Sequence, residues 1–201
     1  MAIIDKLPGI KVTVCVNGEA LPEYPDEDGA NDTIFQQKRE SFTIAPHMQS
    51  SNYVECVSDT EFEVKIEAGP PFNLESQYDQ VVFWVEIDGQ NIAGQYVPLA
   101  NFQDQVFRST IGEALTQINV NELSSRKLQF RGIAKVDEKD KDRIEADKNL
   151  ALGLGEIVVH FHRVKTSTVL TQSRVSRPQA DAAAEIAEKA LKGKAISHGV
   201  G

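Results

Sequence analysis

Two histidines spaced two residues apart are the clearest candidates for chemistry in this sequence. His160 and His162 fall within the apolar stretch 155–164, and side chains two positions apart on a β-strand point to the same face. Two imidazoles on one face could converge on a single zinc ion, as they do in some metalloenzymes. Such a site needs a third protein ligand, and the nearest carboxylate on that face, Glu156, lies farther from His160 than His162 does.

The opposite face of this stretch predicts how the histidines are placed. It carries Ile157, Val159 and Phe161, which are apolar and indicate the buried side of the strand. The histidine pair then faces solvent, so we favour the interpretation that it binds no metal and that the protein has no cofactor. The alternative is a metal-dependent β-sandwich enzyme in which His160 and His162 are the ligands.

Other residues that could do chemistry fail on spacing or setting. Glu61 and Glu63 are paired carboxylates, but they alternate with apolar residues and so belong to the wet face of a strand. Asp140 and Asp142 alternate as in a calcium loop, yet the required turn glycine and closing glutamate are missing. No phosphate-binding or dinucleotide-binding motif is complete in the sequence. We therefore predict no catalytic and no cofactor-binding residues.

The elements that must position these side chains are β-strands. Residues 60–68 read TEFEVKIEA, a period of two that is typical of a strand with one buried face. Residues 81–87, VVFWVEI, form the most apolar strand and predict the centre of the core. The dipeptides Asn17-Gly18 and Asp88-Gly89 favour tight hairpin turns. Together these signals predict a mainly β protein, an antiparallel β-sandwich of about seven to nine strands with one C-terminal α-helix.

Four segments between the clear strands are assigned from weaker patterns. We expect residues 52–57 to pair with residues 60–68, and residues 111–118 to form a short helix. Residues 127–136 predict a further strand. Residues 137–148 carry mixed charges and predict a loop or a surface helical turn.

Composition changes after residue 165, which suggests a boundary. We expect a β-sandwich domain over residues 1–165 and a hydroxyl-rich linker over residues 166–177. Ser176 with Gln179 resembles a capping box, so the Ala-rich residues 178–192 predict the C-terminal helix. Residues 193–201 are then a flexible tail.

Charge and cysteine usage restrict the partners and the compartment. The chain of 201 residues has a formal net charge of −9 at pH 7, which argues against nucleic acid or an anionic membrane as the partner, because Lys and Arg hold those ligands. Asp5 and Pro8 interrupt the apolar run that a secretory signal needs. Cys15 and Cys56 match no CxxC spacing and predict reduced thiols. We expect an intracellular protein, cytoplasmic or nuclear and not secreted.

Five segments carry a resemblance to a known family. In chain order they are GIKVTVCVNGEALPEY (9–24), YVECVSDTEFEVKIE (53–67), VEIDGQNIAG (85–94), LGLGEIVVHFHRV (152–164) and EKALKGKAISHG (188–199). They resemble an uncharacterised fungal family, a domain of unknown function. The resemblance implies a β-rich intracellular domain and transfers no active site. Members of that family continue past the last segment with another apolar strand, so the resemblance also implies an open sheet edge in this chain.

These observations favour a non-catalytic, intracellular protein-interaction module. We expect it to bind protein through a sheet edge or through the Ala-rich helix, with a homo-oligomer formed by the same features as a further expectation. Besides the metal enzyme, a second alternative is a sandwich that binds a small ligand or glycan through exposed Trp84 or Tyr96. Because Trp84 lies in an apolar strand, we expect it in the core instead.

Overall fold

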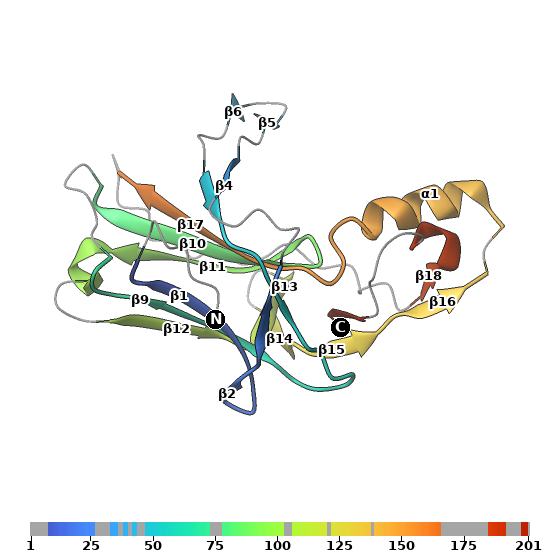
Figure 1. Cartoon of the computed structure of the whole chain (residues 1–201), viewed down its shortest axis with the longest axis horizontal. Coiled ribbons are helices and arrows are strands. Elements are labelled where there is room, and N and C mark those ends of the chain that lie inside the picture. Colours follow the sequence, from blue (N-terminus) through green and yellow to red (C-terminus); the bar gives the residue numbers. More distant parts are fainter. Residues whose placement is uncertain are drawn as a thin grey trace.

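The computed structural model describes residues 8–26, 33–35, 38–39, 42–43, 47–72, 78–102, 106–119, 122–137, 139–165, 185–191 and 198–200. Within these residues the chain is mainly β with several antiparallel sheets, as predicted, and it has one α-helix, which does not lie in the predicted C-terminal segment. Two antiparallel sheets lie face to face in Figure 1 and enclose the main core.

The two facing sheets together contain seven strands, within the predicted range. The first sheet has the order β12 (Phe107–Ile111), β9 (Glu63–Ala68), β1 (Ile10–Val16) and β2 (Glu19–Ala20). The second sheet has the order β11 (Gln90–Pro98), β10 (Gln80–Ile87) and β17 (Ile157–Val164). The segment 81–87 therefore takes the central strand of its sheet, as its apolar composition predicts.

The remaining strands form short pairs around this sandwich. All are antiparallel except β16 with β18, which is parallel. They are β3 (Glu23–Pro25) with β8 (Asn52–Val54), β4 (Thr33–Phe35) with β7 (His47–Gln49), β5 (Lys38–Arg39) with β6 (Phe42–Thr43), β13 (Glu113–Asn119) with β14 (Glu122–Lys127), β15 (Phe130–Gly132) with β19 (His198–Val200), and β16 (Ala134–Val136) with β18 (Glu185–Ala187).

Three helical segments complete the described residues. They are the α-helix α1 (Lys141–Leu150) and the 3-10 helices η1 (Leu99–Phe102) and η2 (Glu188–Ala190). Asp140 caps α1, because its carboxylate accepts a hydrogen bond of 2.9 Å from the backbone N–H of Asp142. The mixed-charge stretch 137–148 is therefore helical over most of its length, which confirms the helical alternative over the loop. No helix among the described residues has the length and hydropathy that a membrane span requires.

Alternation along the strands builds the core between the sheets. Phe62, Val64 and Ile66 are at most 3% exposed on the inner face of the first sheet, as the pattern of residues 60–68 predicts. Phe83 and Val85 of β10 meet them from the second sheet. The two predicted hairpin turns are also present. Asn17 and Gly18, and likewise Asp88 and Gly89, all have positive φ, the conformation of a type I′ turn.

Two predicted elements in the body are wrong. Residues 52–54 pair with β3 and not with β9, because β1 and β12 already occupy both edges of β9. Residues 111–118 do not form a helix: Ile111 ends β12, and residues 113–119 form β13, which pairs with β14. The β-branched Thr116 and Ile118 suit a strand. Pairing with β14 provides hydrogen-bond partners for the backbone N–H and C=O groups, which a helix would pair within itself.

The prediction for the C-terminal segment is also wrong wherever the structure describes it. Within the predicted helix 178–192, residues 185–187 form the strand β18 and residues 188–190 the 3-10 helix η2. Ile186 and Ala187 are both fully buried, so tertiary contacts override the helix propensity of the Ala-rich sequence. Residues 198–200 of the predicted flexible tail form β19, paired with β15. The predicted linker 166–177 lies outside the described residues.

Candidate functional site

The two histidines lie on the outer face of the three-stranded sheet. Within β17, His160 is the pairing partner of Trp84 and His162 that of Val82, both in β10. The Trp84 ring stacks on both imidazoles, with centroid distances of 4.8 Å to His160 and 4.6 Å to His162. The predicted common face of the pair is confirmed. The prediction of Trp84 as a core residue is wrong, since the core-facing neighbours of Trp84 on the strand are Phe83 and Val85.

Glu86 completes this group of outer-face side chains. The Trp84 Nε1–H donates a hydrogen bond of 3.2 Å to Glu86 Oε1. His160 Nε2 lies 3.4 Å from Glu86 Oε2, an ion-pair distance if the imidazole is protonated, but the geometry is not that of a hydrogen bond. The His160 side chain is 28% exposed, so the histidines are half-buried under an indole and do not stand free in solvent.

A metal site at the histidine pair needs further ligands. In the part of the chain that the structure describes, no three His, Cys, Asp or Glu side chains come together in a way that could hold a metal ion. The indole of Trp84, which has no metal-binding lone pair, is the ring that the two imidazoles share. Absence of metal stays a prediction, which the metal content of the purified protein would test against the variant His160→Ala/His162→Ala.

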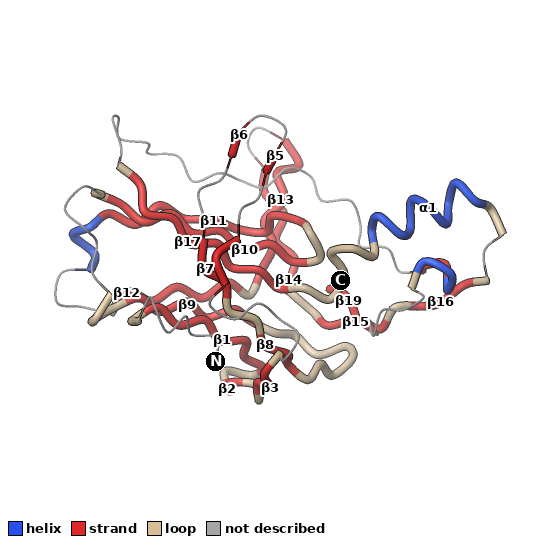
Figure 2. Tube along the Cα trace, turned by 45° about the horizontal axis from the view of Figure 1, so that its top comes forward, coloured by secondary structure: helices blue, strands red, loops and turns tan. Residues whose placement is uncertain are grey.

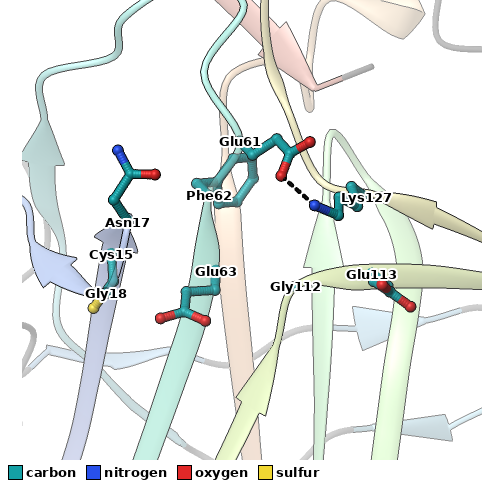
Figure 3. A pocket seen from close by; sticks show the side chains of 9 residues that line it. All are labelled: Cys15, Asn17, Gly18, Glu61, Phe62, Glu63, Gly112, Glu113 and Lys127. Carbon is teal, nitrogen blue, oxygen red and sulfur yellow. Dashed lines mark hydrogen bonds and ion pairs between the residues drawn. The ribbon is translucent and has the colours of Figure 1, made fainter.

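A second group of titratable side chains lines a cleft at one end of the first sheet. The cleft has a volume of about 240 Å³ and is shown in Figure 3. Its lining includes the end of β1, the start of β9 and the base of the β13–β14 hairpin. The side chains that give it chemical character are Cys15, Glu61, Phe62, Glu63, Glu113 and Lys127.

Ion pairs satisfy most of the charges in this cleft. Lys127 Nζ lies 2.6 Å from Glu61 Oε2, the contact drawn as a dashed line in Figure 3. The Lys65 ammonium lies 2.9 Å from Glu63 Oε1 and also donates to the carbonyl of Gly18 at 3.1 Å. Glu113 accepts a hydrogen bond from the hydroxyl of Ser125. The residues that line the cleft carry three carboxylates and one ammonium group, that of Lys127, so the cleft is acidic.

The electrostatics of the cleft do not favour catalysis. Hydrogen bonding to Glu61 raises the pKa of Lys127, and hydrogen bonding to Glu63 raises that of Lys65. Both amines are thus held in the charged form, which is neither nucleophilic nor basic. Cys15 is 2% exposed, so its thiol is shielded. The paired carboxylates Glu61 and Glu63, considered from sequence, act here as partners of lysines.

The hairpin of β13 and β14 is a surface feature that the sequence prediction missed. Every residue of β14 is exposed, and among the described residues β14 pairs with β13 alone. Leu115, Ile118 and Leu123 are 43%, 61% and 55% exposed. Leu115 pairs with Ser125, two residues from Leu123, so the two leucines share one face of the ribbon. The helix predicted over residues 111–118 obscured this arrangement, because Leu115 and Ile118 also fit helical spacing.

The tyrosines of β3 and β8 form a smaller exposed apolar pair. Tyr24 and Tyr53 are direct cross-strand partners and are 51% and 60% exposed. Tyr96, the aromatic residue considered for ligand binding, lies in β11 beside Val82 and is half-buried.

Comparison with known proteins places the whole folded chain in one family. Neither the curated proteins nor the solved structures contain a match to it. A family model described as a domain of unknown function matches residues 9–201, which includes both facing sheets, the hairpin and the C-terminal strands. The chain therefore belongs to the domain of unknown function family DUF7918.

Proposed function

We propose that this protein is a non-catalytic protein-interaction module that binds a partner protein through the β13–β14 hairpin. The observation that carries the proposal is the exposure of Leu115, Ile118 and Leu123 on a ribbon whose second strand is exposed throughout. Exposed apolar side chains that lie together mark interaction surfaces more often than scattered ones do. Among the described residues β14 pairs with β13 alone, and an edge strand of this kind can accept an incoming strand.

The chemistry of the hairpin restricts the partner to an extended segment that pairs along β14. Apolar side chains at alternate positions of such a segment would cover Leu115 and Leu123, since both lie on one face. Lys or Arg side chains of the segment would lie near the acidic cleft, because Glu113 and Lys127 belong both to the cleft and to the base of the hairpin. The net charge of −9 supports a basic partner.

The test compares the capture of cell proteins by the wild type, by one double variant and by one single variant. Leu115→Ser/Leu123→Ser removes the apolar face, and Leu152→Ser removes a leucine that is 65% exposed elsewhere. We expect proteins that the wild type and Leu152→Ser retain and that the hairpin variant loses. A synthetic segment of such a protein, titrated into the labelled wild type, should then shift the amide resonances of β14. Equal capture by the hairpin variant, or shifts confined to another surface, would contradict the proposal.

Two further attributes are proposed with this function. An intracellular location, in the cytoplasm or the nucleus, is supported by Cys15 and Cys56, which are both free. A fungal source is supported by the resemblance of the five segments described above. Fractionation of cells that express the tagged chain tests the location: recovery in the medium would contradict it.

A further inference from the structure

The C-terminal segment is held as a docked peptide by the stretch of chain 130–154. Residues 185–187 pair in parallel with β16, and residues 198–200 return to pair antiparallel with β15. On the other side of the segment, α1 contacts β18 and η2. Figure 1 shows α1, β16 and β18 together at one end of the molecule, beside the sandwich, and Figure 2 shows α1 and β16 at the same end.

The docking contacts are apolar, specific and separate from the main core. Ile186, Ala187, Ala190 and Leu191 are at most 7% exposed, and they form a cluster with Ala151 and Leu154 that does not include any residue of the sandwich core. We call the site that α1, β16, Ala151 and Leu154 form around this segment the docking groove. The groove therefore recognises the segment through its own set of contacts.

Two polar contacts fix the register of the segment in the groove. The backbone N–H of Ala187 donates a hydrogen bond of 2.8 Å to Asp147 Oδ2 of α1. The carboxylate of Glu185 lies 4.0 Å from the guanidinium of Arg143, one turn earlier on the same helix. The segment thus lies between a strand and a helix, and a carboxylate of the helix accepts a hydrogen bond from its backbone. Such contacts are typical of a site that binds a peptide.

The connection between the body and the segment is nineteen residues long. Residues 166–184 join β17 to β18, and a chain of that length can span at most roughly 60 Å. A second copy of the protein carries the same segment and the same groove, so exchange would preserve every contact described above. The two arrangements differ in effective concentration, because a segment on the same chain is tethered to its groove and the segment of a second copy is not.

We propose that the docking groove also accepts the C-terminal segment of a second copy, so that two chains associate by exchanging residues 185–200. This inference is independent of the β13–β14 hairpin. It predicts a wild type that is mainly monomeric at micromolar concentration, and a dimer when a chain with an intact groove but an unusable segment meets a chain with an intact segment.

Complementary variants of the full chain provide the test. Ile186→Asp places a carboxylate at a fully buried position, so this chain has a usable groove and an unusable segment. Ala151→Asp damages the groove at another fully buried position and leaves the segment intact. Each variant alone should stay monomeric by light scattering, and their mixture should form a species of twice the monomer mass.

The matched control is Leu152→Asp, which adds the same charge next to Ala151 at an exposed position. Its own segment stays docked, so it should not associate with Ile186→Asp. A mixture of Ile186→Asp and Ala151→Asp that remains monomeric, while both chains keep the fluorescence of Trp84 and the circular dichroism of the sandwich, would overturn the proposal. Equal dimerisation with Leu152→Asp would overturn it as well.

A second measurement avoids substitutions in the buried cluster. Arg143 and Glu185 are both exposed, so chains with Arg143→Cys and chains with Glu185→Cys should fold normally. The two chains are unfolded, mixed at high concentration, refolded together and then oxidised. Exchange predicts a disulfide-linked heterodimer, which should be missing when Arg143→Ser replaces Arg143→Cys. Recovery of monomers alone would contradict exchange.

Discussion

The sandwich body and the docked C-terminal unit are stabilised in different ways. In the body, strands that are close in sequence or share a face bury Val64, Ile66 and Phe83 between two sheets. In the C-terminal unit, residues 185–191 bury Ile186 and Leu191 against a helix that lies more than thirty residues earlier in the chain. The body is thus held by one core shared between two sheets, whose strand pairs include long-range ones such as β1 with β9 and β10 with β17. The C-terminal unit instead depends on a smaller, separate apolar cluster.

The separate clusters indicate which part of the fold can open without the rest. The two apolar clusters share no residue, so loss of the β18 and η2 contacts removes no side chain from the core between the sheets. A connection to that core is the pairing of β19 with β15, because Phe130 of β15 belongs to the core. Proteins open in cooperative units of unequal stability, and units with few buried apolar contacts open first. We expect the C-terminal unit to open in this way, before the sandwich body does.

The largest effect is expected for Phe83→Ala. Phe83 is fully buried in β10, and its ring lies 5.9 Å from the rings of Phe107 and Phe161. Removal of a buried phenylalanine side chain costs about 3–5 kcal/mol of the free energy of unfolding. Urea unfolding followed by circular dichroism should show this loss as a lower midpoint. The control Val82→Ala, on the outer face of the same strand, should cost less; equal losses would show that the body has no distinct core between the sheets.

Ile186→Ala should cost about 2–5 kcal/mol, but within the C-terminal unit. Ile186 is fully buried against Ala151 and Leu154, so its truncation weakens docking. Hydrogen exchange should accelerate at the amide of Ala187 and leave the amides of β9 and β10 unchanged. Glu188→Ala, an exposed neighbour, should change neither. Equal acceleration in β9 and β10 would show that the two regions unfold as one unit.

The next effect concerns the helix that covers the docked segment. Asp140→Ala removes the carboxylate that accepts the N–H of Asp142 at 2.9 Å, which costs about 1 kcal/mol for an N-cap. We expect faster exchange of the first-turn amides of α1 and of Ala187, because Asp147 of α1 holds that residue. The control Asp140→Asn retains a side-chain oxygen as cap and should behave nearly as the wild type. If the exchange rate of the Ala187 amide stays unchanged, capping of α1 does not contribute to docking of the segment.

The same contrast explains how much of the fold was predictable from sequence. Alternation in residues 60–68 and the Asn17-Gly18 and Asp88-Gly89 turns report local geometry, so the core strands and both hairpins were predicted correctly. The strand β18 was not, because Ala-rich residues favour helix until burial of Ile186 decides otherwise. The pairing of β18 with β16 joins residues about fifty positions apart, which no local pattern records.

The candidate sites were predictable to a smaller extent. The common face of His160 and His162 follows from the period of two, and the structure confirms it. Their stacking on Trp84 requires the pairing of β17 with β10, and that pairing comes from the tertiary fold. The exposed leucines of the hairpin were hidden by a wrong choice of period: Leu115 and Ile118 fit helical spacing as well as they fit a strand with a register shift.

The smallest effect tests whether surface charge contributes to the stability of the body. Glu67 of β9 pairs with Arg108 of β12 at 2.8 Å and with Lys11 of β1 at 3.5 Å, and hydrogen bonding to Arg108, then attraction to Lys11, lowers the pKa of its carboxyl. A lowered pKa in the folded state stabilises the protein above the unfolded-state pKa, and this contribution is lost as the pH falls through the folded-state value.

Glu67→Gln should therefore lower the free energy of unfolding by about 0.5 kcal/mol at pH 7, since water screens these pairs. The difference from the wild type should close as the pH falls below about 4, because protonated Glu67 no longer attracts Arg108 or Lys11. The urea midpoints of both proteins at several pH values measure this difference in the free energy of unfolding. Glu19→Gln is the control for loss of an exposed carboxylate. If the difference between Glu67→Gln and the wild type persists in acid, Glu67 stabilises the body by packing and not by its charge. The core between the sheets would then account for the stability of the body.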